Sequence, residues 1–227
     1  MHIEPGVVDG AKIVLSHGTA AVALAATGWL ALTTARKEGW FALLARAALA
    51  AALTFCFFEV LPHRPVGVSE VHLILGSTLF LLFGPAAVAI GLAAGLLVQG
   101  LFFAPADLPQ YGMNVTTLLA PLFLLSALAK NIVPAQTAYV DLSYAQTLKL
   151  SVAYQGGIVA WVAFWAFYGQ GFGAGNLADV TAFGGAYMTI VLIEPLIDLA
   201  VLAAAKSARA LGRSPLVDRR LYAAHGA

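Results

Sequence analysis

Charged residues and cysteine are scarce in this chain. Only 10% of its 227 residues are Asp, Glu, Lys or Arg, and 61% are hydrophobic, whereas an ordinary soluble domain carries about 25% charged residues. This composition excludes a soluble globular domain and predicts an integral membrane protein. The single Cys56 excludes a disulfide framework. A cleavable signal peptide is not expected, because the start has no basic stretch and carries Glu4 and Asp9.

The chain also lacks a Walker motif. We therefore expect any ATP to be hydrolysed by another chain, and this one not to be an enzyme. No organic cofactor is expected, and no motif suggests nucleic acid. The Arg-rich stretch 206–220 suits anionic lipid headgroups instead.

Long apolar runs predict an all-α membrane bundle, since a transmembrane helix needs about 20 apolar residues. One transmembrane domain, residues 1–205, is expected to begin with a short segment, 1–7, and to be followed by a basic cytoplasmic tail, 206–227. Gly84-Pro85 suits a tight turn between two antiparallel helices. The seven predicted helices cover about 8–34, 40–61, 70–83, 85–103, 113–129, 147–168 and 182–205.

The placement of Lys and Arg predicts the orientation of the bundle, because cytoplasmic segments are enriched in both. With the amino terminus outside and seven spans, only Lys12 and Arg64 of the twelve basic residues fall on the outer side. The carboxy terminus is then cytoplasmic, and we expect a multi-pass protein of a bacterial cytoplasmic (inner) membrane.

Acidic residues are expected to gather on the outer side. Either they fill loops that lack Lys and Arg, or they form a negatively charged vestibule that concentrates a cation. These acids are Glu4, Asp9, Glu59, Glu70, Asp107 and Asp179.

The first two residues offer three adjacent nitrogens: the Met1 amine, the His2 amide and the His2 ring. A metal bound by all three closes a five-membered and a six-membered ring without strain, and one square-planar position remains for another nitrogen. Such sites suit Ni(II) and Cu(II), and imidazole also accepts cobalt and zinc. The site requires that Met1 is retained, which the bulky His2 favours.

Other ionisable residues have several interpretations. His72, expected just inside the membrane boundary, is either bonded to a carbonyl or functional. Glu70 is, in order of preference, a solvated helix-start residue, a partner that orients an imidazole, or a ligand. His17 is either bonded to a carbonyl or supports the metal and its exit. Glu194 and Asp198, one turn apart, are expected to pair with basic tail residues or to contact a partner, and a metal-transfer site is the least favoured alternative.

Four segments of the chain resemble the CbiM/NikM family, the substrate-capturing membrane components of cobalt and nickel energy-coupling-factor (ECF) transporters. Met1-His2-Ile3-Glu4-Pro5-Gly6 is similar to the family's Met-His-Ile start with its Pro, acidic and Gly cluster. Val68-Ser69-Glu70-Val71-His72-Leu73-Ile74-Leu75-Gly76, with Gly84-Pro85 after it, is similar to Gly-Thr-Ser-Gly-His-Leu-Leu-Gly followed by Gly-Pro. Residues 97–103 and 108–114 are similar to the runs Val-Gln-Ala-Leu-Leu-Phe and Leu-Gly-Ala-Asn.

The resemblance, which covers about residues 1–130, implies a site and a substrate. The Met1 amine, the His2 amide and ring, and the His72 ring would surround Co2+ or Ni2+ as the transported substrate. The amino-terminal segment would tuck into the bundle, where Asn114 holds it or the site. Cobalt is slightly favoured, because no long extra domain is fused to the chain.

The chain departs from the family pattern in three places. Glu4-Pro5 inverts the common order of proline and acid, Glu70-Val71 replaces a small Ser-Gly pair, and Thr117 stands where a second Asn is expected.

The resemblance also implies partners. A transmembrane coupling (T) subunit would dock on the small-residue face of the first helix, formed by Ala21, Ala25 and Gly28. ATP-binding ATPase subunits and a small accessory membrane subunit complete the expected assembly.

A different class of function also fits the histidines. His17 and His72 on neighbouring helices would be the axial ligands of a haem in a redox membrane protein. This alternative gives no role to Met1 and His2.

Overall fold

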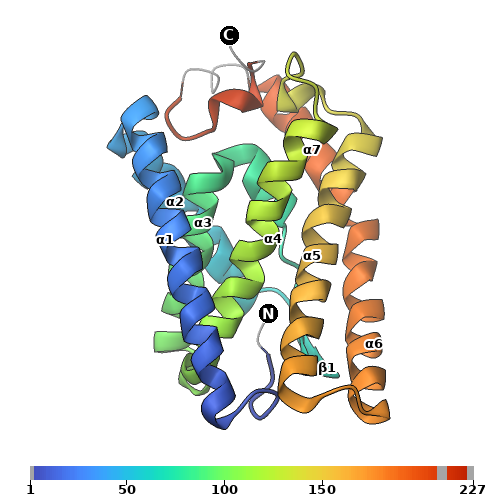
Figure 1. Ribbon diagram of the computed structural model, residues 1–227. Coiled ribbons are helices and arrows are strands. Elements are labelled where there is room, and N and C mark those ends of the chain that lie inside the picture. Colours follow the sequence, from blue (N-terminus) through green and yellow to red (C-terminus); the bar gives the residue numbers. More distant parts are fainter. Residues whose placement is uncertain (1–2, 209–213, 224–227) are drawn as a thin grey trace.

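The structure, a computed structural model, describes residues 3–208 and 214–223. Met1 and His2 lie outside the described residues, as do 209–213 and 224–227 of the tail. The described chain forms a bundle of helices with one small β-hairpin (Figure 1). The helices are α1 (Ile13–Glu38), α2 (Trp40–Glu59), α3 (Gly76–Phe102), α4 (Tyr111–Ile132), α5 (Tyr144–Gln170), α6 (Ala174–Met188) and α7 (Glu194–Ser207), and the strands are β1 (Arg64–Val66) and β2 (Ser69–Val71).

Six helical segments of the described residues are long and apolar enough to cross a membrane, the last of them running through α6 and α7. The prediction of an all-α membrane bundle is confirmed, but the predicted helix at 70–83 was wrongly placed. The error lies at 70–83: residues 69–71 pair with β1, residues 72–75 are not helical, and the helix begins only at Gly76. A run such as Leu73-Ile74-Leu75 reads equally well as strand or as helix.

The chain turns back at Gly84, within α3. This glycine has φ 77° and ψ 161°, a conformation that costs little only without a Cβ. Pro85 then starts the second part of α3. Proline has no amide proton, but the first position of a helix does not need one. Segment 72–83 therefore runs from the hairpin to the opposite end of the bundle, and 85–102 returns (Figure 1).

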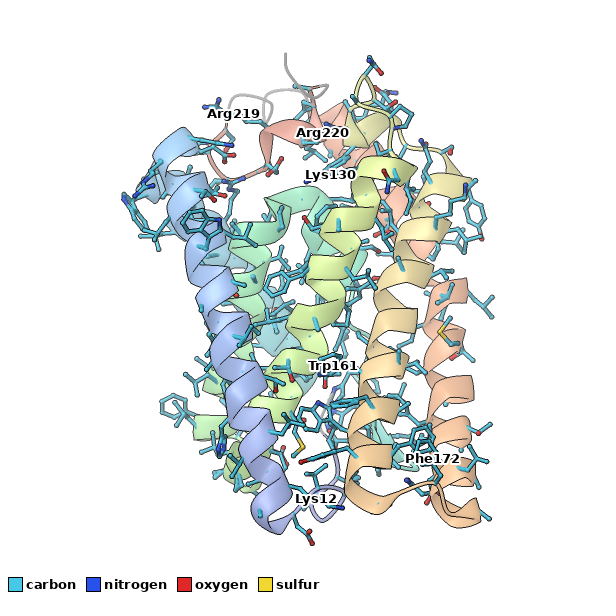
Figure 2. All side chains as sticks on the ribbon, viewed as in Figure 1. Lys12, Lys130, Trp161, Phe172, Arg219 and Arg220 are labelled. Atoms are coloured by element: carbon cyan, nitrogen blue, oxygen red, sulfur yellow. The ribbon has the colours of Figure 1, made fainter. Side chains whose placement is uncertain are left out.

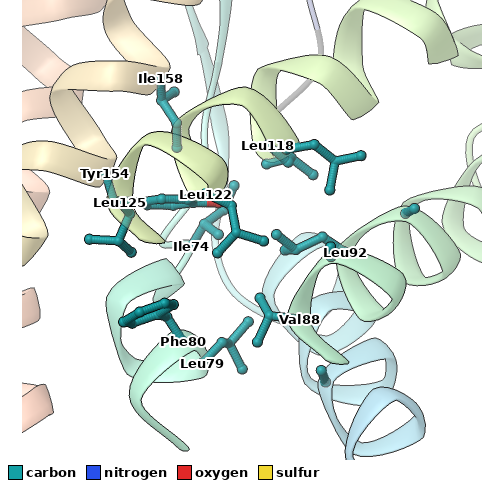
Figure 3. Close-up of a cluster of buried hydrophobic side chains, with 14 of the residues drawn as sticks. Ile74, Leu79, Phe80, Val88, Leu92, Leu118, Leu122, Leu125, Tyr154 and Ile158 are labelled. Atoms are coloured by element: carbon teal, nitrogen blue, oxygen red, sulfur yellow. The ribbon is translucent and has the colours of Figure 1, made fainter. Parts of the chain in front are cut away.

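Leucine, valine and aromatic side chains fill the interior between these two parts of α3 and helices α4 and α5. Figure 3 shows Leu79, Val88 and Leu92 meeting Leu118 and Leu122 there, all buried. Glycine brings backbones close where helices cross, as is common in membrane bundles. Gly91 faces Ala50 of α2, and Gly112 of α4 faces Ser16 of α1.

The two ends of the bundle differ in charge. We call the end with the β-hairpin and Lys12 the hairpin end, and the end with residues 214–223 the tail end. Figure 2 shows Lys130, Arg219 and Arg220 at the tail end. The six acids named above all lie at the hairpin end, on or beside its loops and helix ends. The predicted separation of basic and acidic residues is therefore a feature of the fold.

A buried arginine joins three segments at the tail end. The Arg46 side chain is 1% exposed and pairs with Glu38 at the end of α1 and, at 3.1 Å, with Asp218 of the tail. Asp218 also donates its amide proton to the Leu82 carbonyl at 2.7 Å, just before the Gly84 turn. The two carboxylates compensate the buried charge, and the tail is thereby fixed to the bundle.

Gly91→Ala tests the contact between α2 and α3. A Cβ at position 91 would meet the Ala50 methyl group and approach the Ala50 carbonyl carbon to 2.9 Å. We expect a lower melting temperature in detergent, since overpacking costs about 1–3 kcal/mol. Gly28→Ala in α1 is the matched control because nothing lies within 4 Å of its Cβ position. Equal melting of the two variants would contradict the packing described.

Candidate metal-capture site

The amino-terminal segment enters the bundle beside the hairpin. Ile3 is 1% exposed and forms an antiparallel bridge with Ser69 of β2. Its amide donates to Oδ1 of Asn114 at 2.9 Å, and the Glu4 amide donates to the Val68 carbonyl at 3.2 Å. The backbone that follows directly after Met1-His2 is thus held by α4 and by β2.

The rest of this segment is held by α5. Val7 and Val8 are buried, and the Val7 carbonyl lies so close to Gly169 that a Cβ there has no room. Lys12 donates from Nζ to the Gly169 carbonyl at 2.7 Å. The segment is therefore fixed at both of its ends, by Ile3 and by Lys12.

His72 lies in the non-helical stretch after β2 and is 1% exposed. Its Nε2 is 2.9 Å from Oε2 of Glu70. The His63 ring stacks on it, with centroids 4.7 Å apart and planes at 18°, and the Phe58 ring packs against it at 4.8 Å. No pattern in the sequence indicates this contact, because His63 lies in a short loop between Pro62 and Pro65.

Glu70 is a strand residue, so its interpretation as a solvated helix-start residue is wrong. Its side chain is 24% exposed and contacts the imidazole. An ionised carboxylate accepts hydrogen bonds only, so Nε2 of His72 carries the proton in this contact, and in the neutral ring Nδ1 then carries the lone pair. Glu70 thereby sets the tautomer of the ring.

Negative charge accumulates around the amino-terminal segment. Glu4 is half-buried, and its pKa is raised by burial first and then by the charges of Glu70 and Asp107. Glu59, at the end of α2, accepts a hydrogen bond from Nε2 of Gln99 at 2.8 Å. The charges of Glu70 and Asp107 both act on Glu4 at the hairpin end, and a cation there would be stabilised.

Two other residues from the sequence lie apart from this arrangement. His17 is exposed on α1 and so is not buried with His72, as a haem enclosed between the two rings would require. Thr117 is buried and donates to the Met113 carbonyl of its own helix at 2.8 Å. Within 3–208 and 214–223, no three His, Cys, Asp or Glu side chains form a group that could hold a metal ion.

The fold and the site define a class: a multi-pass membrane protein that holds a buried histidine and an anchored amino-terminal segment at the acidic end of a helical bundle. The family model described as CbiM, cobalt uptake substrate-specific transmembrane region, matches residues 2–211. The chain belongs to this family. It is a transmembrane component of cobalt or other transition-metal transport, not an enzyme, and the resemblance in the sequence is confirmed.

Two solved structures share the fold. One is described as a truncated transition metal transporter, with a TM-score of 0.69 and 18% identity over 92% of this chain and 99% of that chain. The other, described as a transition metal transporter, has a TM-score of 0.68 and 18% identity, over 92% of this chain and 93% of that chain. No curated protein sequence matches the chain.

Asn114→Ala tests the anchor of the amino-terminal segment. The variant leaves the Ile3 amide without its acceptor, and a buried hydrogen bond contributes about 0.5–1.5 kcal/mol. We expect faster deuterium exchange of the peptide containing Ile3, by up to about tenfold. Asn131→Ala, an exposed residue of α4, is the control. Unchanged exchange in the Asn114 variant would show that β2 alone holds the segment.

Proposed function

We propose that this chain is the capture subunit of an ECF-type transporter and that it binds Co2+ or Ni2+, with cobalt slightly favoured, through Met1, His2 and His72. The observation that carries the proposal is the anchoring of Ile3. His2 is joined directly to Ile3, Ile3 pairs with Ser69, and Ser69 lies three residues before His72. One short chain link therefore separates the nitrogen donors of the amino terminus from the buried imidazole.

The chemistry of the donors supports a nitrogen-coordinated metal. The Met1 amine and the His2 amide and ring supply three donors, and Nδ1 of His72 supplies the fourth when Glu70 holds the proton on Nε2. A hydrogen-bonded carboxylate of this kind orients an imidazole ligand and raises its basicity. Capture releases protons, because metal-bound amine, amide and imidazole donors are unprotonated.

The distribution of charge supports an outward hairpin end. Basic residues concentrate at the tail end, which the positive-inside rule places in the cytoplasm of a bacterial cell. The acids Glu4, Glu70 and Asp107 then form the mouth of the site, where they raise the local concentration of a divalent cation.

Exposure along α1 supports a docking face for the coupling subunit. Ala21, Ala25 and Gly28 are all exposed along this helix, and small residues allow close approach of another transmembrane helix. ATPase subunits and a small accessory membrane subunit would complete the transporter, since this chain has no nucleotide-binding motif of its own.

One added residue before Met1 tests the chelate. The extension turns the amine into an amide, and we expect high-affinity cobalt and nickel binding to be abolished, as in His2→Ala and His72→Ala. Each loss should exceed the roughly 10–100-fold that removal of an outer hydrogen-bond partner costs. The readouts are metal content after purification by a carboxy-terminal tag and titration calorimetry. His17→Ala is the control, and tight binding by the extended protein would refute the chelate.

Glu70→Gln tests the orienting carboxylate separately. The amide can present its NH2 group to the ring and so favours the wrong tautomer, and we expect affinity to fall about 10–100-fold. Asp179→Asn removes one negative charge from the same end without touching the imidazole and should have a much smaller effect. If the two variants weaken binding equally, Glu70 acts only through its charge.

A further inference from the structure

Two carboxylates of α7 lie inside the bundle. Glu194 and Asp198 are 0% exposed and belong to the membrane-spanning segment Ala174–Ser207. The expectation that they pair with basic tail residues is wrong for the described part of the chain. Their oxygens accept hydrogen bonds from α3 and α5 instead.

Every one of the four carboxylate oxygens accepts a hydrogen bond from a neutral donor. Glu194 accepts from the Ser77 amide at 3.2 Å, from Oγ of Ser151 at 2.5 Å and from Nε2 of Gln155 at 2.7 Å. Asp198 accepts from Oγ of Ser77 at 2.7 Å and from Oγ1 of Thr78 at 2.5 Å. Two acids and five donors thus form one compact polar cluster.

The cluster carries no compensating cation. Among residues 3–208 and 214–223, no Lys or Arg forms an ion pair with either acid. The amino terminus of helix 76–83 contributes only about half a positive charge. Two ionised carboxylates one turn apart, buried at membrane depth, repel each other and lack hydration, and such groups take up a proton.

Two buried tyrosines lie near this carboxylate cluster. Tyr154 of α5 and Tyr187 of α6 are 0% exposed, and neither hydroxyl has a hydrogen-bond partner among the described residues. The hydroxyl-bearing edge of Tyr154 lies directly on Gly76, where a Cβ has no room, and Figure 3 shows its ring beside Ile74. Both tyrosines lie within the electrostatic reach of Glu194.

We propose that Glu194 and Asp198 form an intramembrane proton-binding site that holds one proton between them at neutral pH. The hydroxyls of Tyr154 in α5 and Tyr187 in α6 are the uncharged titratable groups nearest to the pair in electrostatic terms. The groups facing the pair are these two tyrosines, the hydroxyls of Ser77, Thr78 and Ser151, and the Gln155 amide. No other titratable residue faces it from α3, because segment 73–83 contains none.

The proton site and the proposed metal ligand His72 lie on one segment of the chain. Ser77 and Thr78 bind the pair, and they lie on the same segment as His72, five and six residues further along the chain. That connection rests on the proposed function, whereas the proton site itself does not. The test is therefore chosen to work without any metal.

Infrared spectroscopy of the full chain in lipid nanodiscs tests the site. A protonated carboxylic acid has a carbonyl stretch that ionised carboxylates lack, and it shifts in heavy water. We expect this band at neutral pH in the metal-free wild-type protein, its loss in the double variant Glu194→Gln/Asp198→Asn, and its retention in Asp141→Asn, an exposed acid at the tail end.

Two results would overturn the proposal. One is absence of the band from the wild-type protein at neutral pH, and the other is its persistence in the double variant. If that variant does not fold, wild-type protein labelled with 13C in the side-chain carboxyls of aspartate and glutamate decides instead. The label must move the band to lower frequency, and an unmoved band counts against the site. These outcomes do not depend on whether Met1, His2 and His72 bind a metal, because the measurement uses the metal-free protein.

Discussion

Backbone groups inside a membrane need hydrogen-bond partners, and segment 72–75 lacks the regular bonds of a helix. The Ile74 amide donates to the His72 carbonyl at 3.0 Å, and side chains from other helices add further bonds. Gln155 of α5 donates to the Ile74 carbonyl at 2.9 Å, and Glu194 of α7 accepts from the Ser77 amide at 3.2 Å. A buried His72 on an unwound stretch is possible only because α5 and α7 carry these polar groups, so the site depends on helices far from it in the sequence.

The hairpin fixes the other side of the site. Its turn places Gly67 at φ 59° with the Asp179 carbonyl against it, so that no Cβ fits, and the hairpin is thereby packed on α6. Ile3 then joins the hairpin to Asn114 of α4. The proposed capture site is therefore held by α4, α5, α6 and α7.

The sequence was sufficient for most of the helices and for the concentration of basic residues at one end, because both follow from composition along the chain. It also singled out His72, Asn114 and the first residues through a family pattern. The hairpin was missed because three-residue strands carry no periodic signal and their register depends on Ile3, more than sixty residues away. The contacts of Arg46 with Asp218, and of Glu194 with Ser77, join segments more than a hundred residues apart and leave no local pattern.

Departure from the family pattern at Glu70 has a physical reason in this fold. With a small residue at position 70, Nε2 of His72 would lack this hydrogen-bond partner. The Glu70 carboxylate instead keeps the proton on that nitrogen. The other end of the same segment is fixed by the carboxylates that bind Ser77 and Thr78. Any displacement of His72 relative to α7 must therefore be absorbed by residues 73–75, where the backbone lacks helical bonds, or must break the contacts of Ser77 and Thr78. The proposed metal site and the proposed proton site thus lie at opposite ends of one short, unwound link.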